Sequence, residues 1–269
     1  MTGLVFRLKG EPEERLDLSP LIPERLDGLT SSEIQKLGIG TTKRDLKLGD
    51  VFDVSGADVS DIRFEGGSAR LDKIGLGLSK GSIRVEGDVG FRCGRAMRGG
   101  AITVTGSAGD LAGSAMEDGE LVIQGSAGAR LGGPEAGETK GMSGGAIRVQ
   151  GSAGERAADR MRRGTIVIDG DCGADAASRM IAGTLIVGGK AKGTPGRLMK
   201  RGTLILAGGA ERLAPTFLDC GPQDLIILRL MARAIGEELG AVPFDGSPMR
   251  RYGGDTAVLG MGEVFLPLR

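Results

Sequence analysis

The first absence in this chain of 269 residues is histidine, of which there is none. Histidine is the commonest general base and metal ligand near neutral pH, so its absence removes Ser–His and Cys–His catalytic pairs. Tryptophan is also absent, and there is one tyrosine. A core with so few aromatic rings must be thin and aliphatic, which suits a solenoid better than a globule.

Cysteine is scarce, and Cys93, Cys172 and Cys220 form no C-x-x-C pair. Three unpaired thiols are typical of a reducing compartment, so we expect a cytoplasmic protein without zinc, an iron–sulfur cluster or any other cofactor. No apolar stretch resembles a signal peptide or approaches 18 residues, and no membrane span is expected. Acidic and basic residues balance at 35 each, so no attraction to nucleic acid or membrane is indicated.

Glycine, by contrast, is abundant, with 50 residues but no Gly-X-Y period. A frame Met-x-x-Gly-x-[Ile/Leu]-x-[Val/Ile/Leu]-x-Gly recurs, most clearly at Met161, Met180 and Met199. Recurrence at a fixed spacing of about 19 residues indicates a structural repeat. The glycines that end each repeated strand are Gly66, Gly87, Gly106, Gly125, Gly151, Gly170, Gly189 and Gly208.

The residues two and four positions before each of these glycines are all apolar. Alternation with period two places both residues of each pair on one face of a strand. Stacking of the repeats should therefore build an inward aliphatic ladder, with Met97, Met116, Met142, Met161, Met180 and Met199 filling space at one corner. The pairs are Ile62/Phe64, Ile83/Val85, Ile102/Val104, Leu121/Ile123, Ile147/Val149, Ile166/Ile168, Leu185/Val187 and Leu204/Leu206.

The repeat predicts a mainly β fold, a right-handed parallel β-helix of about eight turns with about 19 residues per turn. We expect three parts: an N-terminal strand/helix cap at 1–47, the glycine-rich column at 48–212, and a C-terminal helix and strand extension at 213–269. The corner glycines are expected to need positive φ. The longest step between repeats contains residues 131–141, which should protrude as a loop.

Local signals place the elements of the two end regions. Residues 4–8 and 264–266 read as strands, and 48–56 as the strand that begins the solenoid. A capping box from Thr30 to Glu33 indicates a short helix over 31–37. Apolar residues at helical spacing predict a helix over 224–239, which Gly240 should end.

Two sets of outward residues are candidate functional sites. Val167, Ile186 and Ile205 form an apolar outward stripe that must be covered, by the chain's own helix over 224–239 or by a partner protein. A basic cluster precedes the strands of the same late repeats, and it serves either in ion pairs or as a dock for an anionic tail or acidic partner. The basic cluster comprises Arg160, Arg162, Arg163, Arg179, Arg197, Lys200 and Arg201.

The repeat resembles the β-helix domain at the C-terminal end of the glutamate synthase large subunit, and also the C subunit of formylmethanofuran dehydrogenase. The flanks favour the second family. They include Ile22-Pro23-Glu24-Arg25, Ser32–Leu37, Leu48–Phe52, Leu213–Phe217 and Gly254-Asp255. The Arg-rich, Lys-poor composition favours the bacterial branch, the formyltransferase/hydrolase complex, over the archaeal CO2-reducing complex.

The resemblance implies a non-catalytic scaffold subunit in tetrahydromethanopterin-linked one-carbon metabolism, from formaldehyde to formate. Its partners would be an amidohydrolase-like subunit, a formyltransferase and other subunits, and the basic cluster could meet a polyglutamylated methanofuran analogue. The alternative hypotheses are a glutamate-synthase-type β-helix subunit that couples domains of an amidotransferase, and a chain that is itself an enzyme.

Overall fold

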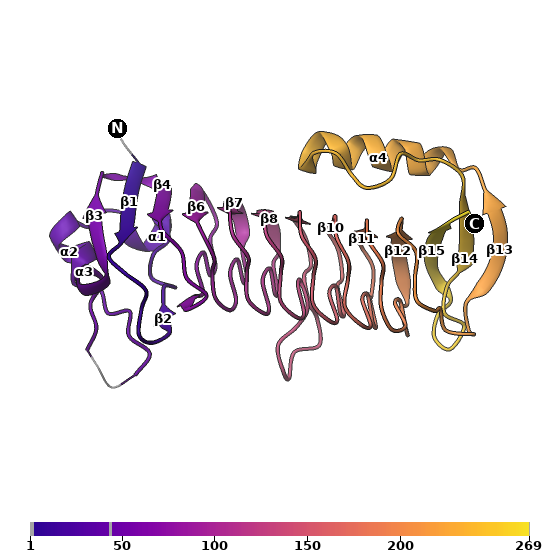
Figure 1. Cartoon of the computed structure of the whole chain (residues 1–269), viewed down its shortest axis with the longest axis horizontal. Helices are drawn as coiled ribbons and strands as arrows, with labels where there is room; N and C mark the ends of the chain where they lie inside the picture. The colour runs from indigo at the N-terminus through magenta and orange to yellow at the C-terminus, as the bar shows by residue number, and fades with distance from the viewer. Residues whose placement is uncertain (1–2, 43–44, 269) are drawn as a thin grey trace.

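Eight parallel strands stack along the long axis of the computed structural model, which describes residues 3–42 and 45–268 (Figure 1). Each strand pairs with the next in the predicted register, so that Ile62 aligns with Ile83 and the series continues to Leu204. All sixteen inward residues are buried, which confirms the aliphatic ladder. The strands are β4 (Asp58–Glu65), β6 (Ser82–Glu86), β7 (Arg98–Val104), β8 (Asp118–Ile123), β9 (Ala146–Val149), β10 (Thr165–Ile168), β11 (Thr184–Val187) and β12 (Arg201–Leu206).

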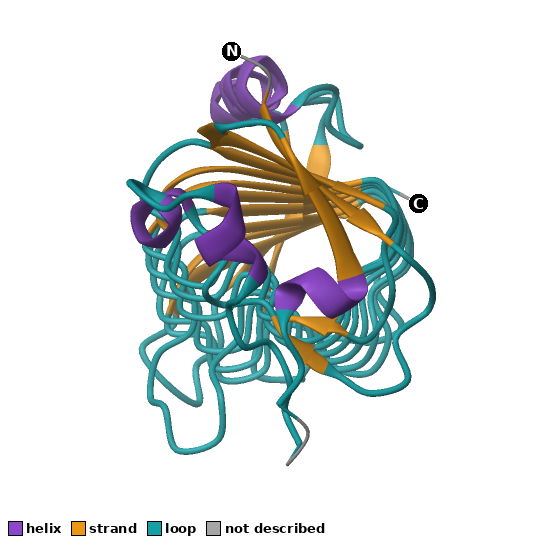
Figure 2. Ribbon diagram, turned by 90° about the vertical axis from the view of Figure 1, so that its left-hand side faces the viewer, coloured by secondary structure: helices purple, strands orange, loops and turns teal. Residues whose placement is uncertain are grey.

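A second ladder of single parallel bridges follows these strands, one residue per repeat. It joins Val89, Ala108, Ala127, Ala153, Cys172, Ala191 and Ala210. Between strands the chain loops beneath the sheet (Figure 2), and it returns one rung further along the column (Figure 1). The six repeated methionines are fully buried, as predicted. Each repeat therefore contributes one sheet strand and one small residue of the second ladder.

The glycines that end the strands are required mainly by close approach of the backbone, which differs from the prediction. Positive φ occurs at Gly66 and Gly87, but not at the six that follow. At Gly125 an added Cβ would lie 2.6 Å from the carbonyl oxygen of Gly106 in the rung before, and at Gly208 it would lie 2.4 Å from that of Gly189. Stacked rungs at this corner leave no room for a side chain.

The N-terminal end differs from the prediction at residues 48–56. Residues Leu48–Val51 form a short helix, α3, and only Phe52–Ser55 is a strand, β3. β3 does not begin the parallel array, because it pairs antiparallel with β1 (Gly3–Leu8), which itself lies between β3 and β4. The Asp50 carboxylate accepts a hydrogen bond from the Lys47 amide at 2.8 Å, which favours a helical turn over a strand.

Short elements complete this end. α2 (Ser31–Gln35) has the predicted capping box, with the Glu33 amide donating to the Thr30 hydroxyl and the Thr30 amide to the Glu33 carboxylate. Three of the seven phenylalanines, Phe6, Phe52 and Phe64, pack together here with ring centroids 5.1–6.3 Å apart. The remaining elements are α1 (Pro23–Leu26), β2 (Leu16–Asp17) and β5 (Leu71–Asp72), with β2 parallel to β5.

The C-terminal region extends the sheet and covers part of it. β15 (Met261–Pro267) includes the predicted final strand and pairs parallel to β12. β14 (Met249–Gly253) pairs antiparallel with β15, and β13 (Leu218–Gln223) pairs antiparallel with β14. The predicted helix is confirmed within two residues as α4 (Ile226–Leu239), with Gly240 at its C-cap. The fold is thus mainly β, with one large and mostly parallel sheet of 13 strands and a C-terminal helix.

The insertion at residues 131–141 projects from the loop side of the column (Figure 1). Two of its carboxylates are held by arginines of an earlier repeat: Glu135 by Arg92 and Glu138 by Arg95, the latter at 2.5 Å. The loop is therefore fixed to the column. Residues 1–2, 43–44 and 269 of the predicted end regions lie outside the described residues, and within these no helix is long and apolar enough to cross a membrane.

Candidate functional site

The outward stripe is covered by the chain's own helix. Val167, Ile186 and Ile205 have no exposed surface and pack in one cluster with Leu228 and Ile235 of α4. The helix runs across the outer face of the late strands (Figure 1). Removal of this apolar surface from water holds the helix to the sheet.

A partly buried arginine fixes the end of the same helix. The Arg148 guanidinium donates to the carbonyl oxygen of Leu239 and to the Asp169 carboxylate, both at 2.7 Å. A cation at the C-terminus of a helix also complements the helix dipole. The outer face of the helix is different, since Ile226, Ile227 and Leu230 are all at least half exposed.

The basic cluster divides into groups with different environments. Arg162, Ile181 and Lys200 occupy equivalent positions, because each amide donates to the carbonyl of the methionine one repeat earlier. Arg163 and Arg201 follow Arg162 and Lys200 directly. Strands one rung apart are about 4.8 Å from each other, so these two pairs of cations are about 10 Å apart, with an apolar rung between them.

These four side chains, Arg162, Arg163, Lys200 and Arg201, are exposed. Together with Ile181 and Leu259 they line a hollow of about 330 Å3, here called the basic groove. Among the described residues none of the four forms an ion pair or a side-chain hydrogen bond. Four unneutralised cations around an apolar floor can hold an anion by charge and an apolar portion of the same ligand by contact.

Arg160 and Arg179 serve the fold instead. Arg179 donates to the Asp159 carboxylate at 2.7 Å, and Arg156 pairs with the same carboxylate at 2.5 Å. Arg160 donates to the main-chain oxygen of Glu138 at 2.7 Å and so holds the insertion loop. Both line a smaller hollow, of about 250 Å3, that shares Lys200 with the basic groove.

Arg197 lies apart from the basic groove, beside Asp255 of the C-terminal segment. Burial raises the pKa of Asp255, but hydrogen bonds from Thr216, Leu198 and Ala257 and the charge of Arg197 outweigh it and leave the pKa below its usual value. The Leu198 amide reaches the Asp255 carboxylate at 2.7 Å. Arg197 therefore acts on the junction between the column and the C-terminal strands.

Sequence reasoning missed two groups. One is Asp159, which is 1% exposed and bridges two arginines. The sequence feature that could have identified it is an acidic residue directly after two small residues, Ala157 and Ala158, in a tightly packed turn. The other is the pairing of the insertion loop with Arg92 and Arg95, since sequence spacing does not show which distant rung a loop meets.

The remaining reactive groups are inert or dispersed. Burial raises the pKa of the Cys93 and Cys172 thiols to about 12, which keeps both protonated and unreactive. Cys220 is exposed on β13. In the part of the chain that the structure describes, no group of three or more His, Cys, Asp or Glu side chains could hold a metal ion.

Comparison with known proteins finds similar subunits in two related enzyme complexes. No protein-family model matches it. The C subunit of the formyltransferase/hydrolase complex Fhc of Methylorubrum extorquens is 55% identical over 264 residues, which are 97% of this chain and 98% of that protein. The C subunit of a molybdenum-containing formylmethanofuran dehydrogenase of Methanothermobacter thermautotrophicus is 35% identical over 96 residues, 34% of this chain and 24% of that protein.

A solved structure of the same complex is also similar to this chain. The crystal structure of the FhcABCD complex from Methylorubrum extorquens with methylofuran contains a chain that superposes with a TM-score of 0.93 at 45% identity, covering 98% of this chain and all of that chain. The similarity spans the column and both end regions, as the flanking segments in the sequence predicted. This chain belongs to the family of the C subunit of the formyltransferase/hydrolase complex, which is related to the C subunit of formylmethanofuran dehydrogenase.

Proposed function

We propose that this chain is the scaffold subunit of a formyltransferase/hydrolase complex, acting in tetrahydromethanopterin-linked conversion of formaldehyde to formate in the cytoplasm. The observation that carries this proposal is similarity over nearly the full length to a subunit of that complex, in sequence and in structure. Conversion of the formyl group belongs to the partner subunits, an amidohydrolase-like one and a formyltransferase.

The architecture supports a scaffold role. We take the column predicted at 48–212, whose repeated parallel strands begin with β4 at Asp58, to be a right-handed parallel β-helix, because connections between parallel strands of one sheet are right-handed in nearly all proteins. The parts at 1–47 and 213–269 lie at its two ends. Continuous hydrogen-bonded rungs make a stiff rod, and the exposed apolar face of α4 at Ile226, Ile227 and Leu230 is a surface of the kind that partner proteins cover.

The side chains also support the absence of a catalytic site in this chain. Without histidine, general-base chemistry would need a carboxylate, a thiolate, a lysine or a tyrosine with a suitable pKa. Asp159, which is among the most buried carboxylates, is neutralised by two arginines, and two of the three thiols are buried. Within the described residues, neither Asp159 nor the two buried thiols line the basic groove or the smaller hollow beside it.

The basic groove is the proposed contact for a polyglutamylated methanofuran analogue. A tail of carboxylates matches four exposed cations, and the similar complex was crystallised with methylofuran. Such contacts between exposed charges weaken as salt is added. The groove would hold or guide the tail while the formyl-bearing end reaches the catalytic subunits.

Purification of the tagged chain from its native host tests the scaffold role. We expect an amidohydrolase-like subunit and a formyltransferase to co-purify in fixed ratio, while the isolated chain turns over no formyl donor. Co-purification of a glutaminase or an FMN protein would instead favour the glutamate-synthase alternative. Turnover by the pure protein would overturn the scaffold assignment.

Replacement of Arg162, Arg163, Lys200 and Arg201 by alanine tests the basic groove. We expect the affinity of the assembled complex for methylofuran to fall about tenfold or more, since four exposed charge contacts worth up to about 1 kcal/mol each are lost. The matched control removes four exposed cations elsewhere, Lys36, Lys80, Arg84 and Arg233. Equal affinity and equal salt dependence in both variants would exclude the groove as the contact.

A further inference from the structure

The second ladder, the series of parallel bridges from Val89 to Ala210, is paired further at its N-terminal end but not at its C-terminal end. At the N-terminal end it continues, since the Gly90 amide donates to the Leu71 carbonyl of β5 and β5 is in turn paired with β2. At the C-terminal end the last bridge is Ala191 to Ala210. The sheet on the other side of the same rung does continue, because β15 pairs with β12. The end of the column is thus closed along one ladder and open along the other.

Hydrogen bonds show what the open position would accept. Each ladder residue donates its amide to one residue of the next rung and accepts an amide from the residue two further on. Ala191, for example, donates to the Gly209 carbonyl at 3.0 Å and accepts from the Glu211 amide at 2.9 Å. Within the described residues the amide and carbonyl of Ala210 have no hydrogen-bond partner. A donor and an acceptor are therefore presented in the spacing of a parallel strand.

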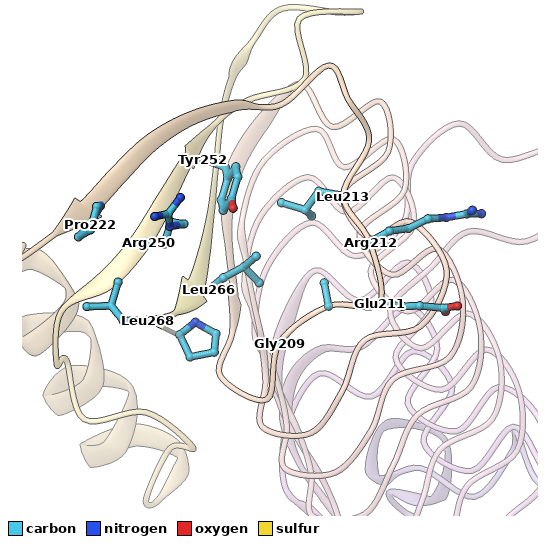
Figure 3. A pocket seen from close by; sticks show the side chains of 11 residues that line it. Gly209, Glu211, Arg212, Leu213, Pro222, Arg250, Tyr252, Leu266 and Leu268 are labelled. Atoms are coloured by element: carbon cyan, nitrogen blue, oxygen red, sulfur yellow. The ribbon is translucent and has the colours of Figure 1, made fainter.

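A pocket of about 510 Å3 lies at this open rung, between the end of the column and the last three strands (Figure 3). The Leu213 side chain points toward Tyr252, and Leu266 and Leu268 also line the pocket. Leu268 is 46% exposed. The pocket therefore offers apolar contact area beside an unpaired backbone edge, which is the combination that strand addition uses.

Charge favours a neutral occupant. Arg250 in the lining is paired with Asp219 at 2.5 Å, and the pocket's other two charged residues, Glu211 and Arg212, are of opposite sign. An anionic tail would thus find no net positive charge here, in contrast to the basic groove. Five of the seven ladder residues are alanine, so a small side chain is what stacks on Ala210.

We propose that the open rung at Ala210 and its pocket bind an extended, uncharged segment of a different subunit, which adds in parallel as the next rung. The segment carries a small residue stacked on Ala210 and an apolar neighbour between Leu213 and Tyr252. This proposal rests on the proposed function, because the segment is taken to come from another member of the complex.

Hydrogen exchange of the full chain, alone and in the purified complex, tests the proposal. We expect the Ala210 amide to exchange at least tenfold more slowly in the complex. The Ala191 amide is the internal control, since its bond to Gly209 is present in both states. Equal exchange at Ala210 in an intact complex would overturn this inference alone, whereas failure to assemble would overturn the proposed function together with it.

A pair of variants provides a second readout. Leu268→Glu places a charge in the pocket at an exposed position and should weaken assembly at least tenfold without changing the melting temperature. Leu29→Glu, at the opposite end of the molecule, should stay within twofold of the original chain. Protection of Ala210 by methylofuran alone, or in the free chain with rising concentration, would assign the rung to a small molecule or a second copy and contradict the proposal.

Discussion

At the scale of single residues, backbone conformation alone does not explain why some repeats need glycine in the loop beneath the sheet and others do not. Leu111, Gly113 and Ala115 all have positive φ, between 53° and 63°, in the loop beneath the sheet. The equivalent of Gly113 in two later repeats is alanine, at Ala158 and Ala177, with φ of 58° and 54°. The left-handed conformation costs a non-glycine residue about 1–2 kcal/mol, so φ alone does not forbid a side chain there.

Repeats with glycine at this position differ from repeats with alanine in the side chain that faces it from the second strand further along the chain. A Cβ at Gly113 would lie 2.3 Å from Cδ1 of Ile147, and one at Gly132 would lie 2.6 Å from Cδ1 of Ile166. By register the corresponding residues for Ala158 and Ala177 are Leu185 and Leu204. Leucine at that position leaves room for a methyl group, and isoleucine does not.

Replacement of Gly113 by alanine should therefore lower the free energy of unfolding by about 1–3 kcal/mol, from backbone strain and overpacking together. Adding Ile147→Leu should recover most of the packing part, because it recreates the pairing of the later repeats. Urea denaturation of both single variants and the double variant measures this. If the two changes were simply additive, the proposed contact would not be the cause.

At the scale of elements, the two faces of α4 contribute differently to stability. Leu228 is fully buried against the outward stripe, while Leu230 on the same helix is 54% exposed. The sequence placed the helix correctly because its apolar spacing is local. It left open whether this helix or a partner covers the stripe, since that depends on how the chain returns over the sheet.

Leu228→Ala should destabilise the protein by about 2–5 kcal/mol through loss of burial and the cavity left behind. Leu230→Ala on the exposed face should change stability by less than about 0.5 kcal/mol. Far-UV circular dichroism during urea unfolding compares the two, and proteolysis within residues 240–248 reports detachment of the helix. Equal losses would mean that the helix does not rest on the sheet as described.

At the scale of the whole molecule, buried and half-buried carboxylates join segments that are far apart in sequence. Asp255 ties the C-terminal strands to the last rung through the Leu198 amide, and Glu138 ties the insertion loop to Arg95. Both have a lowered pKa. For Glu138 the causes begin with its hydrogen bond to Arg95, and for Asp255 the hydrogen bonds and Arg197 outweigh burial.

Stability should accordingly fall in acid. A carboxyl group with a folded-state pKa below its ordinary value, 3.8 for Asp255 and 4.5 for Glu138, stabilises the fold fully above the ordinary value. That contribution is lost as pH falls through the folded pKa. Asp255→Asn should be less stable at pH 7 and flatter between about pH 4.5 and 3 in urea titrations. An unchanged pH profile in this variant would contradict the role of Asp255.

The sequence by itself determined the column. The strands from β4 to β12, their register, the buried pairs and the methionines were predicted because a repeat applies the same local alternation to every rung, and hydrophobic burial allows one register only. The strand predicted at 48–56 was wrong, since that segment lies outside the repeat. The family was also readable from the repeat and its flanks. The predicted basic cluster mixed residues with separate roles, because sequence gives the position of an arginine but not its partner.

Only the tertiary structure decided the rest. It divided the basic cluster into the four cations of the exposed groove and three other arginines. Of these, Arg179 is held by Asp159, Arg160 by the main chain of Glu138, and Arg197 lies beside Asp255. It inserted β1 between β3 and β4, and it left Ala210 as an open rung. The physical reason is that these features depend on contacts between segments tens of residues apart, where no periodic constraint fixes which groups meet.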